Sequence, residues 1–224
     1  MMDFDDVLKW EAYLKKLVDK HHLSLAEQIK DTLSRCCRTE ITSEGKNLGY
    51  RGNYNPSLFT NLVVSNAKKG RVYKKAPLDK HQTYEIGFDN MNRVIYAKHN
   101  EKIENKDWIT HEFIWYENNA QYSVTWNEIP EDNFSEREAF TLLYVEQGHP
   151  QLYMLMNYCE GIKKELSSEL EEYVYGNDVL CEIIVHTIGV LEDAKKAKNL
   201  EKKYGGKAYG DKLYSICRYK LDIM

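Results

Sequence analysis

A hairpin pattern recurs every 29 residues, and this period constrains the fold more than any other feature of the chain. The stretch YEIGFDNMNRVIYAKH, residues 84–99, has aromatic and β-branched runs on both sides of a polar tip, as β-hairpins do. Steps of 29 from Asn90 in that tip reach Asn119, Gly148 and Asn177, each inside a similar stretch. Asn, Asp and Gly tolerate the left-handed conformation of tight turns. The period therefore predicts four consecutive hairpins with eight antiparallel strands.

The segments outside the repeats predict helices and one further hairpin. Apolar residues at three- and four-residue spacing indicate helices before residue 38, and Ser24 with Glu27 forms a capping-box pattern at the start of the second one. Residues 40–57 are rich in Gly and Asn and predict an irregular loop. A first hairpin is then expected from LFTNLVVS and RVYKK, within residues 58–75.

The expected fold class is α+β in a single domain, residues 1–224. Its parts are a helical hairpin (1–38), a long antiparallel meander of hairpins (58–188, with period 29 from residue 84), a helix (190–204) and a terminal strand (208–224). Such a meander would have about 8–10 strands. Because long sheets twist, it would curl into a half-barrel or fold into two layers.

Composition favours a cytoplasmic protein. Of 224 residues, 42% are hydrophobic, enough for a core, and no apolar run approaches the roughly 18–20 residues that span a bilayer. The start, MMDFDDVLKW, is acidic and lacks the apolar region of a secretory signal. The five cysteines are odd in number and have no C-x-x-C spacing, which indicates reduced thiols. No common cofactor, metal or catalytic motif occurs, so none is assigned and an enzyme is disfavoured.

The net charge of −4 conceals an uneven distribution. Residues 35–80 hold ten basic and three acidic side chains, a balance of +7. Residues 100–182 hold five basic and eighteen acidic side chains, a balance of −13. A charged block can simply be solvated surface. The alternative interpretation is an acidic face that meets a basic protein partner.

Aromatic side chains gather inside this acidic block. Trp115 and Tyr116 are adjacent, so one of them faces away from the core if the strand is regular. Exposed Trp and Tyr are typical interface anchors, although large aromatics also serve cores. The predicted partner-binding residues are Glu112, Trp115, Tyr116, Glu117, Tyr122, Trp126 and Glu128.

Two other kinds of site remain open. The 29-residue step joins His99, Glu128, Asn157 and His186 near strand ends. Their imidazoles and carboxylate could hold a metal or share acid–base work if curvature brings them together, or they could be solvated strand ends. A basic segment could follow a nucleic-acid backbone or protect a sheet edge. Its residues are Lys68, Lys69, Arg71, Tyr73, Lys74 and Lys75.

The stretches FDNMNRVI (88–95) and YVYGNDVLCEI (173–183) resemble the YD-type hairpin repeats of bacterial Rhs-like proteins, with an aromatic before the polar tip and β-branched residues after it. The resemblance covers about half of the chain, and two units depart from it: NNAQYSV lacks the Gly or Arg, and EQGHPQL has a proline in the tip. Similar meanders occur in immunity proteins encoded beside polymorphic toxins. The resemblance implies an immunity protein that neutralises a cognate toxin. The missing catalytic motifs, the reduced cysteines and the acidic block favour a non-enzymatic, cytoplasmic antitoxin whose toxin is basic.

Overall fold

A computed structural model describes residues 1–44, 54–64, 68–79, 81–159 and 164–221. The chain forms two compact units. Unit 1 comprises Met1–Asp19, Glu117–Tyr122 and Ala139–Met224, and unit 2 comprises Lys20–Tyr116 and Ser123–Glu138. No helix among the described residues is long and apolar enough to cross a membrane.

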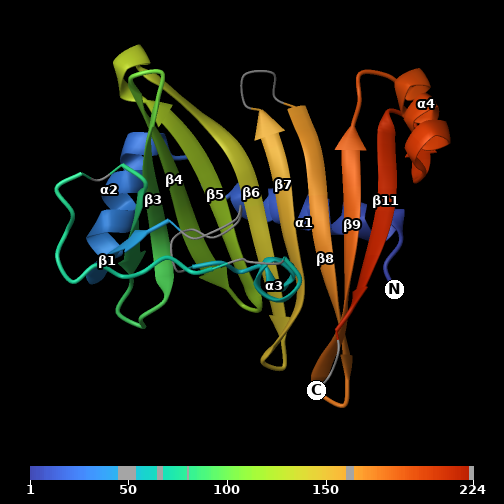
Figure 1. The fold of residues 1–224 in the computed structure, drawn as a ribbon, viewed down its shortest axis with the longest axis horizontal. Helices are drawn as coiled ribbons and strands as arrows, with labels where there is room; N and C mark the ends of the chain where they lie inside the picture. The colour runs from blue at the N-terminus through green and yellow to red at the C-terminus, as the bar shows by residue number, and fades with distance from the viewer. Residues whose placement is uncertain (45–53, 65–67, 80, 160–163, 222–224) are drawn as a thin grey trace. The chain divides into compact units, whose positions relative to one another are not determined.

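An antiparallel sheet of 11 strands dominates the structure, in the order β1-β2-β3-β4-β5-β6-β7-β8-β9-β11-β10 (Figure 1). Its strands are β1 (Arg38–Ser43), β2 (Thr83–Phe88), β3 (Val94–Ile103), β4 (Lys106–Glu117), β5 (Ala120–Ile129), β6 (Phe134–Glu146), β7 (His149–Cys159), β8 (Lys164–Gly176), β9 (Val179–Val190), β10 (Lys207–Tyr209) and β11 (Lys212–Lys220). The long antiparallel meander is confirmed, but the described chain is mostly β and matches the α+β class only in part.

The four hairpins with a shared period are confirmed as β2–β3, β4–β5, β6–β7 and β8–β9. Their tight turns use the predicted residue types: φ is +52° at Asn118, +84° at Gly148 and +50° at Asn177. The first turn differs because the Asp89 side chain accepts hydrogen bonds from the backbone N–H groups of Met91 and Arg93. The Asp89-Asn90 tip is therefore ordinary turn chemistry.

The predicted first hairpin at 58–75 is wrong. Leu58–Leu62 forms a short helix, α3, because the Ser57 hydroxyl caps it by accepting the Thr60 N–H. Part of the expected loop at 40–57 is instead strand β1, whose Arg38–Ser43 pairs with β2 in register Ile41↔Glu85. The rest of that loop, residues 45–53, lies outside the described residues.

The predicted helices are confirmed, and each begins at a side-chain cap. They are α1 (Phe4–Val18), with a capping box of Asp3 and Asp6, α2 (Leu25–Arg35), with a capping box of Ser24 and Glu27, and α4 (Ala194–Tyr204), which Asp193 caps. Gly205 ends α4 with φ +83°, a conformation that suits glycine.

In unit 1, α1 lies on one face of the sheet. Phe4 stacks on Tyr209 of β10 at 4.0 Å between ring centroids, and the buried Glu11 accepts a hydrogen bond from Ser168 of β8. A row of buried side chains crosses neighbouring strands beneath it, in the register Leu142↔Met154↔Leu170↔His186. A histidine thus occupies a core position in line with three apolar side chains.

Candidate functional site

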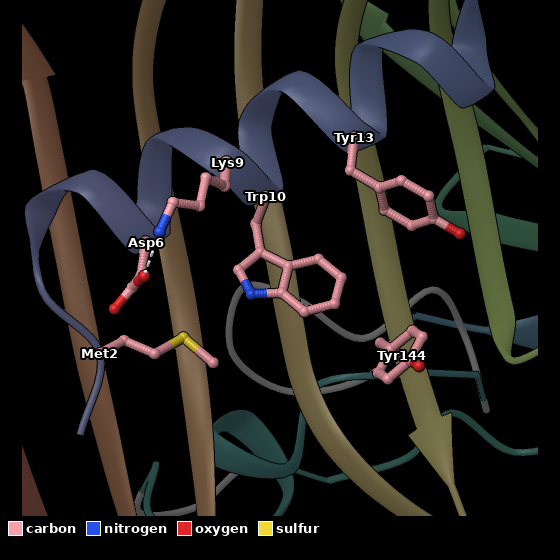
Figure 2. Close-up of a pocket in the computed structure, with 6 residues that line it drawn as sticks. All are labelled: Met2, Asp6, Lys9, Trp10, Tyr13 and Tyr144. Atoms are coloured by element: carbon pink, nitrogen blue, oxygen red, sulfur yellow. Dashed lines mark hydrogen bonds and ion pairs between the residues drawn. The ribbon is translucent and has the colours of Figure 1, made fainter.

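A pocket of about 590 Å³ lies between α1 and the sheet in unit 1 (Figure 2). Pockets that hold drug-sized ligands typically have about 300–1,000 Å³. The side chains that line it are Met2, Asp6, Lys9, Trp10, Tyr13 and Tyr144. All but Tyr144, which comes from β6, belong to α1 or to the residues just before it. The pocket is therefore formed where the N-terminal helix crosses the sheet.

Three aromatic rings form the interior of this pocket. The ring centroid of Trp10 lies 5.1 Å from that of Tyr144 and 5.7 Å from that of Tyr13, in tilted and edge-on orientations. Figure 2 shows Trp10 between the Met2 side chain on one side and the two tyrosines on the other. All four side chains are half-buried. Each ring thus keeps part of its surface accessible, which is unfavourable in water and favourable against an apolar group.

An ion pair lies at the edge of the pocket, on the surface of α1. The Lys9 Nζ lies 2.8 Å from the Asp6 Oδ1, one turn earlier on α1. The hydrogen bond from Lys9 lowers the pKa of Asp6, so Asp6 is a carboxylate at neutral pH. Exposed ion pairs of this kind contribute little to stability. Loss of the contact between Lys9 and Asp6 would therefore change the stability of the protein little, so either side chain can form an ion pair with a different group.

Two of the predicted partner-binding residues are neighbours of this pocket. The hydroxyl of Tyr122 is buried, and burial together with the nearby Glu117 carboxylate and Tyr13 phenol raises its pKa to about 12. Glu117 is half-buried, and Tyr13 lines the pocket. The acidic end of the β4–β5 hairpin therefore lies beside the aromatic lining within unit 1.

The other predicted interface residues are in unit 2 and make internal contacts. Glu112 is buried and accepts a hydrogen bond from Ser123. Trp126 is 7% exposed, so neither residue can meet a partner in this conformation. Trp115 and Tyr116 are half-buried: Trp115 stacks on His21 at 3.9 Å, and the Tyr116 hydroxyl donates to the Val94 carbonyl.

Each residue of the predicted His99, Glu128, His186 rim has a local partner. Within unit 2, His99 pairs with Glu44 rather than with Glu128. Glu128 Oε2 lies 2.9 Å from His111 Nε2, and the Tyr96 hydroxyl lies 2.8 Å from His111 Nδ1.

Unit 1 contains a matching arrangement around His186. Its Nε2 lies 3.0 Å from Glu172 Oε2, and its Nδ1 lies 2.7 Å from the Tyr214 hydroxyl. In both Tyr–His–Glu triads the buried histidine is on the middle strand of three. The tautomer with hydrogen on Nε2 donates to the carboxylate and accepts from the phenol, which satisfies both ring nitrogens. Such closed networks stabilise a core and leave no reactive group free.

The triads make the stability of the protein depend on pH. Burial alone would raise the pKa of Glu172, but hydrogen bonds from His186 and the Met2 N–H outweigh it and lower that pKa to about 2. Burial lowers the pKa of His111, against the opposing hydrogen bond to Glu128. In both cases the unfolded chain binds protons at a higher pH than the folded chain does.

We therefore expect stability to fall as the pH is lowered. The His111 contribution is complete above about pH 6.5 and is lost below it, and the Glu172 contribution is complete above about pH 4.5 and is lost towards pH 2. The Glu172 part is on the order of 2 kcal/mol after allowance for solvent screening. Urea unfolding at a series of pH values from about 7 to about 3 measures the free energy of unfolding. In Glu172→Gln its decrease at the acidic end of this range should be smaller. Constant or rising stability over that range would contradict this.

The basic segment lies along the outer edge of the sheet in unit 2. The Ser43 N–H donates to the Arg71 carbonyl, and the Tyr73 N–H donates to the Ile41 carbonyl. The backbone around Val72 therefore pairs with β1, which is the first strand in the sheet order. The lysines Lys68, Lys69, Lys74 and Lys75 are exposed. This placement agrees with edge protection.

Several of these residues were not predicted from the sequence. Asp6, Trp10 and Tyr13 follow one another at spacings of four and three residues, so they share one side of α1, and this was the available signal. The contribution of Tyr144 and the two triads depends on strand register, which the sequence does not specify.

Comparison of the chain with protein-family models, with curated proteins and with solved structures found no match. The assignment of function therefore depends on the geometry of the chain itself.

Proposed function

We propose that this chain is a protein-binding module, and that the aromatic pocket between α1 and β6 is the centre of its interface. The observation that carries the proposal is the set of three half-buried rings around about 590 Å³ of space. Trp and Tyr are the residues most enriched among binding hot spots. A pocket lined by them accepts an apolar or aromatic side chain from a partner.

Charge favours a basic partner. The segment 100–182, which includes Glu117 and the strands around the pocket, carries a balance of −13. Asp6, at the edge of the pocket, is ionised, and its Oδ1 is paired with an exposed lysine while its Oδ2 accepts the Asp3 N–H of the capping box. A lysine or arginine beside the partner's anchoring side chain can replace Lys9 on Asp6. Such charge complementarity steers association and selects the partner.

The more specific form of the proposal is a cytoplasmic immunity protein of bacterial origin that neutralises a basic cognate toxin. The hairpins with a shared period and the acidic block support it, together with the resemblance of the meander to immunity proteins encoded beside polymorphic toxins. The fold by itself does not decide function. The immunity-protein form of the proposal is therefore tested by an experiment with the partner.

The proposal is tested by co-expressing the full chain with the product of the neighbouring gene and purifying the complex. We expect an equimolar complex that weakens as salt increases, because screening reduces the attraction between an acidic face and a basic protein. The activity of the partner should be inhibited in that complex. Separate elution of the two proteins at low salt would contradict the proposal, as would binding that does not change with salt.

A further inference from the structure

A histidine in unit 2 is placed between two carboxylates. His99 of β3 is 7% exposed, and its ring nitrogens face Glu44, just after β1, and Glu101, two residues further along β3. Among the described residues, these three form the one group of three or more His, Cys, Asp or Glu whose ligand atoms all lie within 4.8 Å of one another.

The two nitrogens of His99 differ in what they can do. Nε2 lies 2.7 Å from Glu44 Oε1, which is hydrogen-bond distance. A neutral imidazole has a single N–H, so with its hydrogen on Nε2 the Nδ1 atom presents a lone pair. That lone pair faces Glu101 Oε1 at 3.6 Å, too far for a hydrogen bond. Two electron-rich atoms thus face the same space.

The separation of these two atoms suits a shared metal ion. Zinc binds imidazole nitrogen and carboxylate oxygen at about 2.0–2.2 Å, and a tetrahedral angle then places the two donors roughly 3.4 Å apart. The distance of 3.6 Å between Nδ1 and Oε1 is close to that value. A cation between them would also remove the repulsion between lone pair and carboxylate.

Neighbouring groups hold the imidazole in this orientation. The ring of Tyr84 stacks on it at 4.2 Å between centroids, with 8° between the planes. Glu44 accepts from Nε2, and the Glu44 backbone N–H donates to the Gln82 carbonyl at 3.3 Å. A carboxylate on the far nitrogen of a histidine is the usual arrangement around a metal-bound imidazole.

We propose that His99 Nδ1 and Glu101 bind a divalent transition-metal ion of the zinc class, with Glu44 orienting the imidazole. Water would complete the coordination, since two protein donors leave positions open on a four-coordinate ion. The site is separate from the proposed binding function and does not depend on it. It also replaces the predicted rim, because His99 is joined here by Glu101 and not by Glu128 or His186.

The test is titration of the full chain with Zn²⁺, followed by the ring-nitrogen resonances of His99 in ¹⁵N NMR. This readout is chosen because exposed Cys37 and Cys217 can also take zinc. Glu101→Gln removes the carboxylate from a half-exposed position and should leave the fold intact. Glu104→Gln, at an exposed position in the turn that follows β3, is the matched control.

We expect a metal-induced shift confined to Nδ1 of His99. Binding should weaken by roughly 10–100-fold in Glu44→Gln, as for other orienting carboxylates, and by at least as much in Glu101→Gln, whereas Glu104→Gln should match the wild type. The proposal is overturned if Zn²⁺ leaves the His99 resonances unchanged. Unchanged zinc affinity in Glu101→Gln would overturn it equally.

Discussion

Replacement of His186 by leucine should lower the free energy of unfolding by about 3–5 kcal/mol, because it leaves the Glu172 carboxylate without its buried hydrogen-bond donor and the Tyr214 hydroxyl without its acceptor. The His186 side chain is fully buried and Glu172 is 12% exposed, so water cannot replace the lost hydrogen bond efficiently. Tyr214, also buried, loses its partner on Nδ1. Urea unfolding monitored by tryptophan fluorescence measures the loss.

The second triad provides an internal comparison. Glu128 is 31% exposed, so it can regain water when His111 is replaced by leucine. That substitution should therefore cost less than His186→Leu. His22→Ala, at an exposed position, is the control and should change stability by no more than about 0.5 kcal/mol. A loss below about 1 kcal/mol for His186→Leu would show that the triad does not stabilise the fold.

Trp10→Ala should have the largest effect on partner binding. Truncation of a central interface tryptophan typically costs at least about 2 kcal/mol, which is roughly thirty-fold in Kd. The indole lies between Met2 and two tyrosines, so its removal takes away the middle of the aromatic lining. The thermal melting curve of Trp10→Ala shows whether this variant still folds. Tyr204→Ala, an exposed aromatic of α4 that does not line the pocket, is the matched control.

The repeated hairpins were predictable because their signals are local. A tight turn needs residues that accept positive φ, and Asn118, Gly148 and Asn177 supply it within a few residues of the strands they join. Helix α2 was equally predictable, because Ser24 and Glu27 are three residues apart and form its capping box. Signals of this kind do not depend on the rest of the fold.

The β1 strand was mispredicted because distant residues decide it, and α3 was mispredicted because its cap outweighs its apolar composition. The segment Arg38–Ser43 becomes a strand by pairing with β2, whose paired residues lie 40 to 50 positions later in the chain. The Leu58–Leu62 stretch is apolar enough for a strand, but its Ser57 cap starts a helical turn. Turn-rich composition and short apolar runs therefore gave the wrong prediction at both places.

The site residues were harder to predict, because partners on a sheet are set by register. The 29-residue step places His99, Glu128 and His186 at equivalent positions in their hairpins, yet side chains pair with adjacent strands. Lys98 is opposite His111, so Tyr96 reaches that histidine diagonally, and Tyr214 reaches His186 in the same way. Equivalence along a repeat gave no information about such diagonal pairs.

The central claim is that the aromatic pocket binds a basic partner, and isothermal titration calorimetry of the neighbouring gene product tests it most directly. The wild-type chain, Trp10→Ala and Tyr204→Ala would each be titrated at one fixed salt concentration. The account predicts that Trp10→Ala raises Kd roughly thirty-fold or more, while Tyr204→Ala leaves it unchanged. Equal affinity for all three proteins, with Trp10→Ala folded, would contradict the account.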